Sequence, residues 1–98
     1  MMQEHARIVK DEDVMGGEPR IKGHRISVRQ IAERVEGRGL KPQTVADRYD
    51  LDVADVYHAL AYYHDHPEEM AKIEREREEL EKEALEKYSD SNSIESKN

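Results

Sequence analysis

The chain has 98 residues, of which 40% are charged and 36% apolar, with five Tyr and no Phe, Trp or Cys. This length allows one small domain with a modest aliphatic core. A sequence without cysteine excludes a disulfide scaffold, a thiolate zinc site and a cysteine nucleophile. The longest apolar run, Ala59 to Tyr63, is far shorter than the roughly 20 residues of a membrane-spanning helix, and no signal-peptide pattern is visible. We therefore expect a cytoplasmic protein with no membrane partner.

The net charge of -7 is distributed unevenly along the chain. Residues 20–48 carry eight bases and three acids, a net charge of +5, whereas residues 49–98 carry 15 acids and six bases, a net charge of -9. Because the sign of a surface charge governs which ligands it attracts, the two regions predict different partners. The alternative is an acid-rich surface suited to a salty cytoplasm.

The N-terminal segment predicts a small β-ribbon. Glycine and proline residues, which form turns, punctuate residues 7–28, and apolar and charged side chains alternate between them. Gly23 and His24 fit a tight hairpin turn. The short strands predicted between the turns are residues 8–9, 20–22 and 25–26.

A first helix is predicted to begin at Val28. Ser27 and Gln30 have the spacing of a capping box, in which each side chain bonds to the backbone N–H of the other residue. Gly37 and Gly39 end this helix, because glycine favours the helix C-terminus.

Two further short helices follow. The second begins at Pro42, a residue favoured in a first helical turn, and ends at Tyr49. Asp52 caps the third helix, which ends before Pro67 because proline breaks a helix interior. The inward positions of the three helices predict one buried cluster, made of Ile31, Val35, Val45, Leu51, Val56 and Leu60.

Residues 67–88 predict a charged amphipathic helix. Their apolar stripe is interrupted by Arg77, so a self-sufficient coiled coil is not expected. Residues 89–98 are polar and are predicted to be disordered. The predicted fold class is mainly α: a β-ribbon and a three-helix domain over residues 1–66, followed by the charged helix. The short connection between the second and third helices fits a helix-turn-helix unit, although other small helical bundles use similar loops.

The segment GGEPRIKGHRISV, from Gly16 to Val28, resembles the signature of the domain of unknown function 433 family, whose members include VapB-type antitoxins. The likeness extends over residues 7–66. The sequence departs from the family pattern at four positions. His24 stands where Thr is usual, Asp50 where Pro is usual, and Lys41 and Asp52 stand at helix caps where Ser or Thr is usual. The resemblance implies a helix-turn-helix domain that acts as antitoxin to a PIN-like ribonuclease encoded beside it.

A DNA contact, if the chain makes one, is expected on the side of the ribbon. The third helix has the place of a recognition helix, yet its exposed residues include no Arg or Lys, and Asp55 would repel phosphate. The residues predicted to hold a DNA backbone are Arg20, Lys22, Arg25 and Arg29.

Catalytic and metal sites are not expected. No Ser, His and acid grouping has a recognisable catalytic motif, and the glycines match no dinucleotide or P-loop pattern. His58, His64 and His66 are not spaced three or four residues apart, as metal ligands on one helix face would be. We therefore expect a non-enzymatic protein without a cofactor.

The charged helix is predicted to bind the protein partner. An apolar stripe too broken to pair with itself gains order by docking into a groove, and nine acids from Glu68 to Glu86 suit a basic ribonuclease surface. The alternative is a solvated helix without a partner. The anchors predicted for the ribonuclease are Met70, Ile73, Leu80 and Leu85.

The predicted function is that of an antitoxin that neutralises a PIN-like ribonuclease and could also bind its own promoter. The alternative is a stand-alone helix-turn-helix regulator of transcription, and a structural adaptor is a third class. Self-association of the chain stays open.

Overall fold

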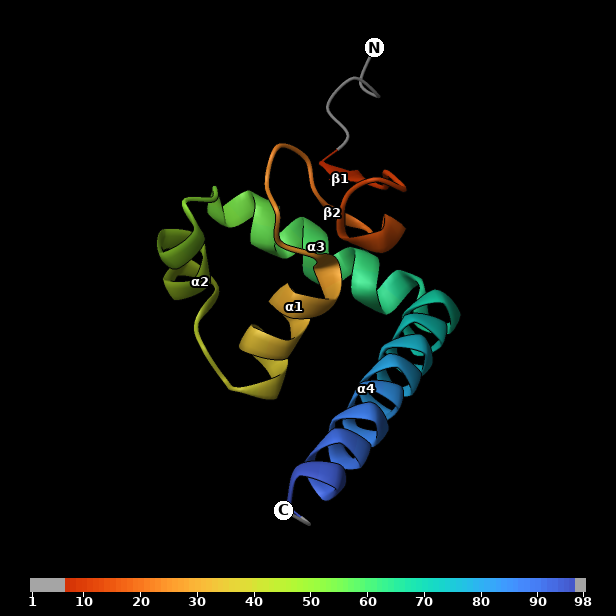
Figure 1. The fold of residues 1–98 in the computed structure, drawn as a ribbon. Helices are drawn as coiled ribbons and strands as arrows, with labels where there is room; N and C mark the ends of the chain where they lie inside the picture. Colours follow the sequence, from red (N-terminus) through yellow and green to blue (C-terminus); the bar gives the residue numbers. More distant parts are fainter. Residues whose placement is uncertain (1–6, 97–98) are drawn as a thin grey trace. The chain divides into compact units, whose positions relative to one another are not determined.

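A computed structural model describes residues 7–96 of the chain, with side chains up to residue 89. The chain divides into two compact units, residues 1–67, which we call the head, and residues 68–98. The fold is mainly helical with one short two-stranded antiparallel sheet, which confirms the predicted class (Figure 1). The elements in chain order are β1 (Ile8–Val9), a 3₁₀ turn (Met15–Gly17), β2 (Arg20–Ile21), α1 (Val28–Ala32), a π-helical segment (Glu33–Gly37), α2 (Pro42–Tyr49), α3 (Val53–Asp65) and α4 (Pro67–Ser96).

The ribbon is formed by β1 and β2, whose register pairs Ile8 with Ile21. Residues 25–26, predicted as a strand, do not form one. Arg25 lies in the turn that follows β2. In place of a second strand pair, a single β-bridge joins Arg20 to Ser27. The chain turns at Gly23, which has a positive φ, and Ser27 caps α1. The residues between this turn and the helix are therefore too few to form a second pair of strands.

The predicted capping box at the start of α1 is confirmed. The Gln30 backbone N–H donates to Ser27 Oγ at 3.1 Å, and the Ser27 backbone N–H donates to Gln30 Oε1 at 2.9 Å. The helix passes into the π-helical segment, which ends at Gly37. A π turn holds one residue more than an α turn, so the phase of the apolar stripe shifts along this segment.

Helices α2 and α3 have the predicted bounds at their N-termini. Pro42 stands in the first turn of α2, and Asp50 ends that helix in the left-handed conformation, with φ 58°. Asp52 precedes α3, and its backbone N–H donates to Asp55 Oδ2 at 3.1 Å. Three residues therefore join α2 to α3, and both α1 and α2 pack against α3 (Figure 1).

The core of the head lies between these helices and the ribbon. Ile31, Val45 and Val56 are fully buried, as predicted. The predicted cluster is wrong for Val35, Leu51 and Leu60, which are only half-buried. Val35 lies in the π-helical segment, Leu51 in the turn before α3, and the buried line of α3 runs through Asp55, Val56 and Ala59, so Leu60 lies at its edge. The space near β2 is filled by Ile21, Ile26 and Val28.

Helix α4 begins at Pro67, and its backbone stays helical to Ser96. Residues 89–96, for which we expected disorder, are thus helical, because each residue added to an existing helix gains a hydrogen bond without a new nucleation step. Residues 97 and 98 lie outside the described part of the chain. No helix among the described residues is long and apolar enough to cross a membrane.

Candidate functional site

The four cations predicted to hold DNA are divided by the structure into two internal and two exposed residues. Arg20 is internal: its side chain is only 10% exposed, and its Nη2 donates to Asp11 Oδ2 at 2.7 Å. Its Nη1 donates to the backbone oxygens of Ile21 and His24. The guanidinium of Arg20 thus ties the loop before β2 to the turn after it.

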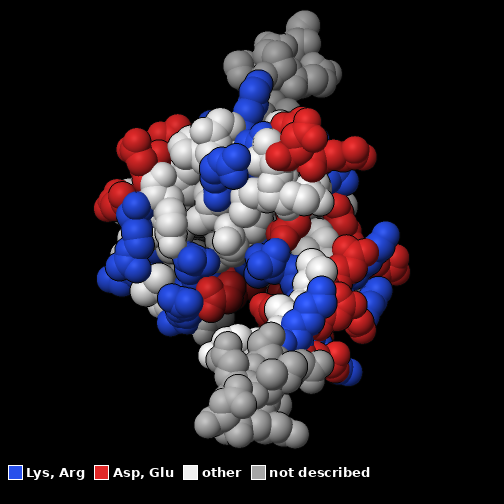
Figure 2. All heavy atoms as spheres, in the orientation of Figure 1, with Lys and Arg blue, Asp and Glu red and all other residues white. Residues whose placement is uncertain are grey.

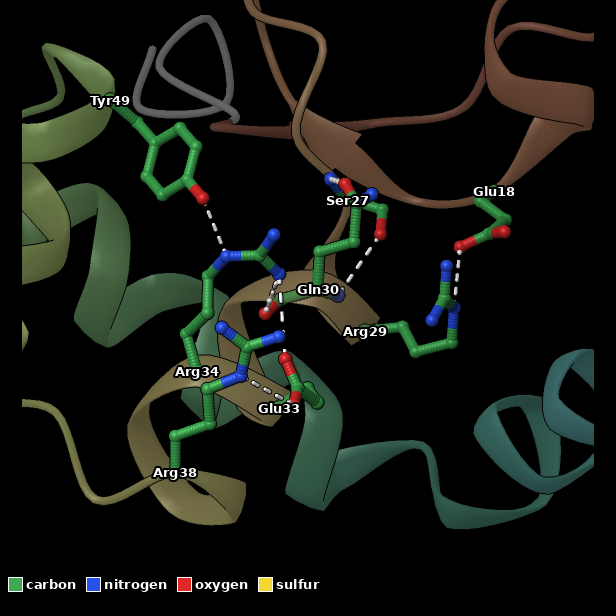
Figure 3. A network of polar contacts seen from close by, with 8 residues as sticks. All are labelled: Glu18, Ser27, Arg29, Gln30, Glu33, Arg34, Arg38 and Tyr49. Carbon is green, nitrogen blue, oxygen red and sulfur yellow. Dashed lines mark hydrogen bonds and ion pairs between the residues drawn. The ribbon is translucent and has the colours of Figure 1, made fainter.

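Arg29 is the second internal cation. Its Nε donates to Glu18 Oε1 at 3.3 Å, and both side chains are largely buried. This pair joins the first turn of α1 to the segment that precedes β2 (Figure 3). The charge of Arg29 is therefore compensated inside the head.

Lys22 and Arg25 remain exposed in the turn after β2. Three further exposed cations, Arg38, Lys41 and Arg48, lie on α2 and on the connection that leads to it. Figure 2 shows Lys and Arg side chains over this part of the head, at the left of the view, with a few acids among them. These five exposed cations thus lie in the turn after β2 and in residues 38–48, outside the ribbon strands.

Helix α3 contains no Lys or Arg. Tyr57, His58 and Ala61 are exposed on its outward face, whereas Tyr62, which we also expected to be exposed, is half-buried. Asp55, which we expected to repel phosphate, is instead buried, and its Oδ1 forms an ion pair with Arg7 Nη1. The fold brings Arg7, next to β1, to Asp55, which lies 48 positions later in the chain. The positive charge of Arg7 compensates the Asp55 carboxylate, so this carboxylate does not act as a free negative charge.

The histidines take part in local contacts. His64 Nε2 lies 2.8 Å from Glu36 Oε2, which joins α3 to the π-helical segment. The His66 ring stacks on Tyr62, with ring centroids 3.9 Å apart. Among the described residues, no three His, Asp or Glu side chains are placed to hold a metal ion.

The four predicted partner anchors differ in exposure. Leu80 and Leu85 are 64% and 65% exposed, whereas Ile73 is half-buried and Met70 is only 3% exposed. Tyr88, which the prediction left out of the anchors, is 64% exposed. Tyr88 follows Leu80 by eight residues, which is close to two helical turns. This spacing could have placed Tyr88 among the predicted anchors.

A polar cluster that the sequence did not predict lies between α1 and α2. Arg34 Nε donates to the Tyr49 hydroxyl, and Arg34 Nη1 donates to the Gln30 backbone oxygen at 3.1 Å (Figure 3). The guanidinium carbon also lies 5.3 Å from the centre of the Tyr49 ring. Glu33 pairs with Arg38 at 2.9 Å and lies 3.5 Å from Arg34 Nη1. The sequence showed Arg34 only as an exposed helix residue, because its partner Tyr49 is 15 positions away.

The chain belongs to the family described as "Protein of unknown function (DUF433)", whose model matches residues 8–63. The match covers the ribbon, α1, α2 and most of α3, and it ends before α4 begins. No curated protein and no solved structure matches the chain. The family description states no activity, so the function has to be argued from the surfaces of the molecule.

Proposed function

We propose that this chain is a non-enzymatic antitoxin that binds and neutralises a PIN-like ribonuclease through α4. The observation that carries the proposal is the exposure of three large apolar side chains on one helix, Leu80, Leu85 and Tyr88. Contiguous exposed apolar groups are a feature of interaction surfaces, because water contact with them is unfavourable. The resemblance to VapB-type antitoxins supports the choice of partner.

The apolar residues of α4 form one face. At about 100° per residue, Ile73, Leu80, Ala84 and Tyr88 fall within an arc of roughly 80°, and Leu85 lies beside it. We therefore place the partner surface on the stretch from Ile73 to Tyr88. Met70 belongs to the same arc and is only 3% exposed.

The charges around this face suit a basic partner. Residues 68–88 carry nine acids and five bases. A ribonuclease binds a polyanion, so the surface around its active site is expected to be basic. Acidic side chains beside the apolar face would compete with RNA for that surface, while the apolar anchors supply most of the affinity.

The test replaces Leu80 and Leu85 by Gln, which keeps the net charge and has nearly the helix propensity of Leu. Affinity for the ribonuclease encoded beside this chain should fall about 30-fold or more, as expected when two apolar anchors are lost. Titration calorimetry gives the affinity, and rescue of cells that express the ribonuclease gives the biological result.

The matched control is Glu79→Gln with Lys82→Gln, two exposed positions on the opposite side of α4. Like the test variant, the control introduces two Gln residues and leaves the net charge unchanged. It should retain binding to the ribonuclease. Full neutralisation by the Leu80 and Leu85 variant, with helical content unchanged in circular dichroism, would place the partner surface elsewhere and contradict the proposal.

We propose promoter binding as a second function of the head. The observation that favours it is the packing of α1 and α2 on α3, with three residues between α2 and α3, which is typical of a helix-turn-helix unit. Lys22 and Arg25 are the backbone contacts in this proposal, since Arg20 and Arg29 are held in internal pairs.

The DNA proposal is tested with a duplex of the chain's own promoter. Lys22→Gln with Arg25→Gln should weaken binding and reduce its salt dependence by about two counterions, because each cation neutralises one phosphate. Tyr57→Ala with His58→Ala is the comparison. Loss of binding in that variant alone would show that α3 reads the DNA and that the ribbon-side assignment is wrong.

A further inference from the structure

The head contains a pocket of about 260 Å³, and Arg25 is the one residue of its lining that a proposed function uses, as a contact to DNA. It lies between the turn after β2, the stretch formed by α1 and the π-helical segment, and the end of α2. Its lining residues are His24, Arg25, Ile26, Gln30, Arg34 and Tyr49. Two of these residues are arginines and none is acidic, so the pocket has a positive charge.

Arg34 is held in a fixed orientation beside this pocket. Its side chain is 22% exposed and is anchored by the Tyr49 hydroxyl, the Gln30 backbone oxygen and, at 3.5 Å, Glu33. These contacts use the Nε and Nη1 donors. The two N–H groups of Nη2 have no partner among the described residues and remain for a ligand.

The other polar residues of the lining also have unused donors. The Gln30 side-chain oxygen accepts from the Ser27 backbone N–H, which leaves the amide NH₂ of Gln30 without a partner in the described part of the chain. The Tyr49 hydroxyl accepts from Arg34 and can still donate its own proton. Arg25 is exposed and makes no hydrogen bond or ion pair with the described residues.

His24 supports the wall of the pocket. Its Nδ1 lies 3.1 Å from the Lys22 backbone oxygen, and its Nε2 lies 3.3 Å from the Asp50 backbone oxygen. The ring therefore connects the turn after β2 to the turn between α2 and α3. A neutral imidazole donates to one of these two backbone oxygens.

We propose that this pocket binds the terminal phosphate group of a small molecule. Five donors come from Arg34 Nη2, the Gln30 amide and the Tyr49 hydroxyl, before Arg25 adds its own. Three terminal phosphate oxygens provide enough acceptors for this set, whereas a carboxylate has only two oxygens. Guanidinium groups recognise phosphate through paired, charge-assisted hydrogen bonds.

A terminal phosphate fits the pocket better than a nucleic-acid backbone. A phosphodiester continues through two ester bonds and presents only two free oxygens, and it follows an open surface. A phosphomonoester enters a concave site with three oxygens in front and one ester bond behind. The ligand class is therefore a small phosphomonoester, and this site does not depend on the antitoxin role.

The test titrates the full chain with phenyl phosphate at constant ionic strength and follows backbone amide shifts by NMR. Saturable shifts should appear at residues 24–34 and at Tyr49. Arg25→Gln should weaken binding about tenfold or more, as expected for the loss of hydrogen bonds to a charged group. Arg34→Lys should have a similar effect, because Lys keeps the charge but cannot form the paired contact.

Arg48→Gln is the matched control, since it removes one exposed cation of the head that does not line the pocket. An equal loss of affinity in Arg48→Gln and Arg25→Gln would show general attraction to the basic surface and overturn the proposal. Because Arg25 makes no hydrogen bond or ion pair with the described residues, its variant tests the site even if Arg34→Lys unfolds.

Three other ligands complete the test. Benzoate or dimethyl phosphate binding as tightly as phenyl phosphate would contradict a site for phosphomonoesters. Binding of a DNA duplex that is lost in Arg25→Gln, without any binding of phenyl phosphate, would assign these donors to a nucleic-acid backbone and overturn the proposal. No saturable shift with phenyl phosphate would overturn it as well.

Discussion

The head and α4 are both rich in helix, yet different interactions hold them. In the head, Ile21, Ile31, Val45 and Val56 are at most 1% exposed, and each helix buries at least one apolar residue. In α4, every side chain from residue 71 to residue 89 is exposed except the half-buried Ile73. Helicity in the head thus depends on tertiary burial, whereas in α4 it depends on residues that favour helix locally.

Because of this difference, substitutions in the head and in α4 should have different consequences. A residue that is buried within its own unit contributes to folding, so its truncation lowers the stability of the protein whether or not a partner is present. An apolar residue that its own unit leaves exposed contributes little to folding and is free to contribute to binding. The head is therefore where substitutions should change stability, and α4 is where they should change affinity.

The largest expected effect comes from truncating one apolar residue in each region. Ile31→Ala should lower the free energy of unfolding of the head by about 2 to 5 kcal/mol, because the side chain is fully buried. Leu80→Ala should change it by less than about 0.5 kcal/mol, because the side chain is 64% exposed. Urea unfolding followed by circular dichroism measures both, and equal losses would contradict the division.

The next largest effect on stability should distinguish two carboxylates near Arg7. The Asp55 side chain is 11% exposed and that of Asp52 is 83% exposed, although both lie within 4.0 Å of the Arg7 guanidinium. Asp55→Asn should destabilise the head by about 1 to 3 kcal/mol, because it leaves a partly buried charge without its counterion. Asp52→Asn should be close to neutral, since Asn also caps helices well. A larger loss in Asp52→Asn would show that burial does not determine how much each carboxylate contributes, and it would contradict this prediction.

Substitutions at two helix caps should change stability by a smaller amount, one lowering it and the other raising it. Ser27→Ala removes a capping bond from α1 and should lower stability by about 1 kcal/mol. Lys41 precedes α2 in an extended conformation, with φ -71° and ψ 144°, and its side chain makes no capping bond. Lys41→Ser should therefore raise the stability of the head by up to about 1 kcal/mol. Thermal unfolding gives both signs, and a destabilised Lys41→Ser would indicate another role for that lysine.

The smallest effect is expected at an exposed ion pair within the head. Arg38 and Glu33 lie 2.9 Å apart, but their side chains are 59% and 45% exposed. Arg38→Ala should change the free energy of unfolding by less than about 1 kcal/mol, because water and salt screen such pairs. A loss near that of Asp55→Asn would show that position in the head, rather than burial, determines the contribution of a charge.

Sequence reasoning worked best where the determining contacts are close along the chain. The capping box joins Ser27 to Gln30, three positions apart, and α2 begins at Pro42 and ends at Tyr49 as predicted. It failed for Val35, because a π-helical segment shifts the phase of the buried stripe. It also failed for Arg20 and Arg29, which looked like surface cations until the fold placed Asp11 and Glu18 beside them.

The candidate sites follow the same rule. The apolar stripe of α4 could be read from spacing alone, because a single helix fixes which residues share a face. The pocket around Arg34 could not, because its lining comes from three segments that meet only in the folded head. Exposure at Leu80 and burial at Met70 also had to be taken from the structure.

The sequence by itself determined the mainly helical class, the three short helices, the ribbon and the charged C-terminal helix, since periodicity, caps and turns are local properties of the chain. Only the tertiary structure decided which charges are compensated and which remain available. Arg7 reaches Asp55 across 48 residues, and Arg34 reaches Tyr49 across 15. Electrostatic and hydrogen-bond partners are chosen by distance in space, and sequence spacing gives that distance only within a single helix or turn.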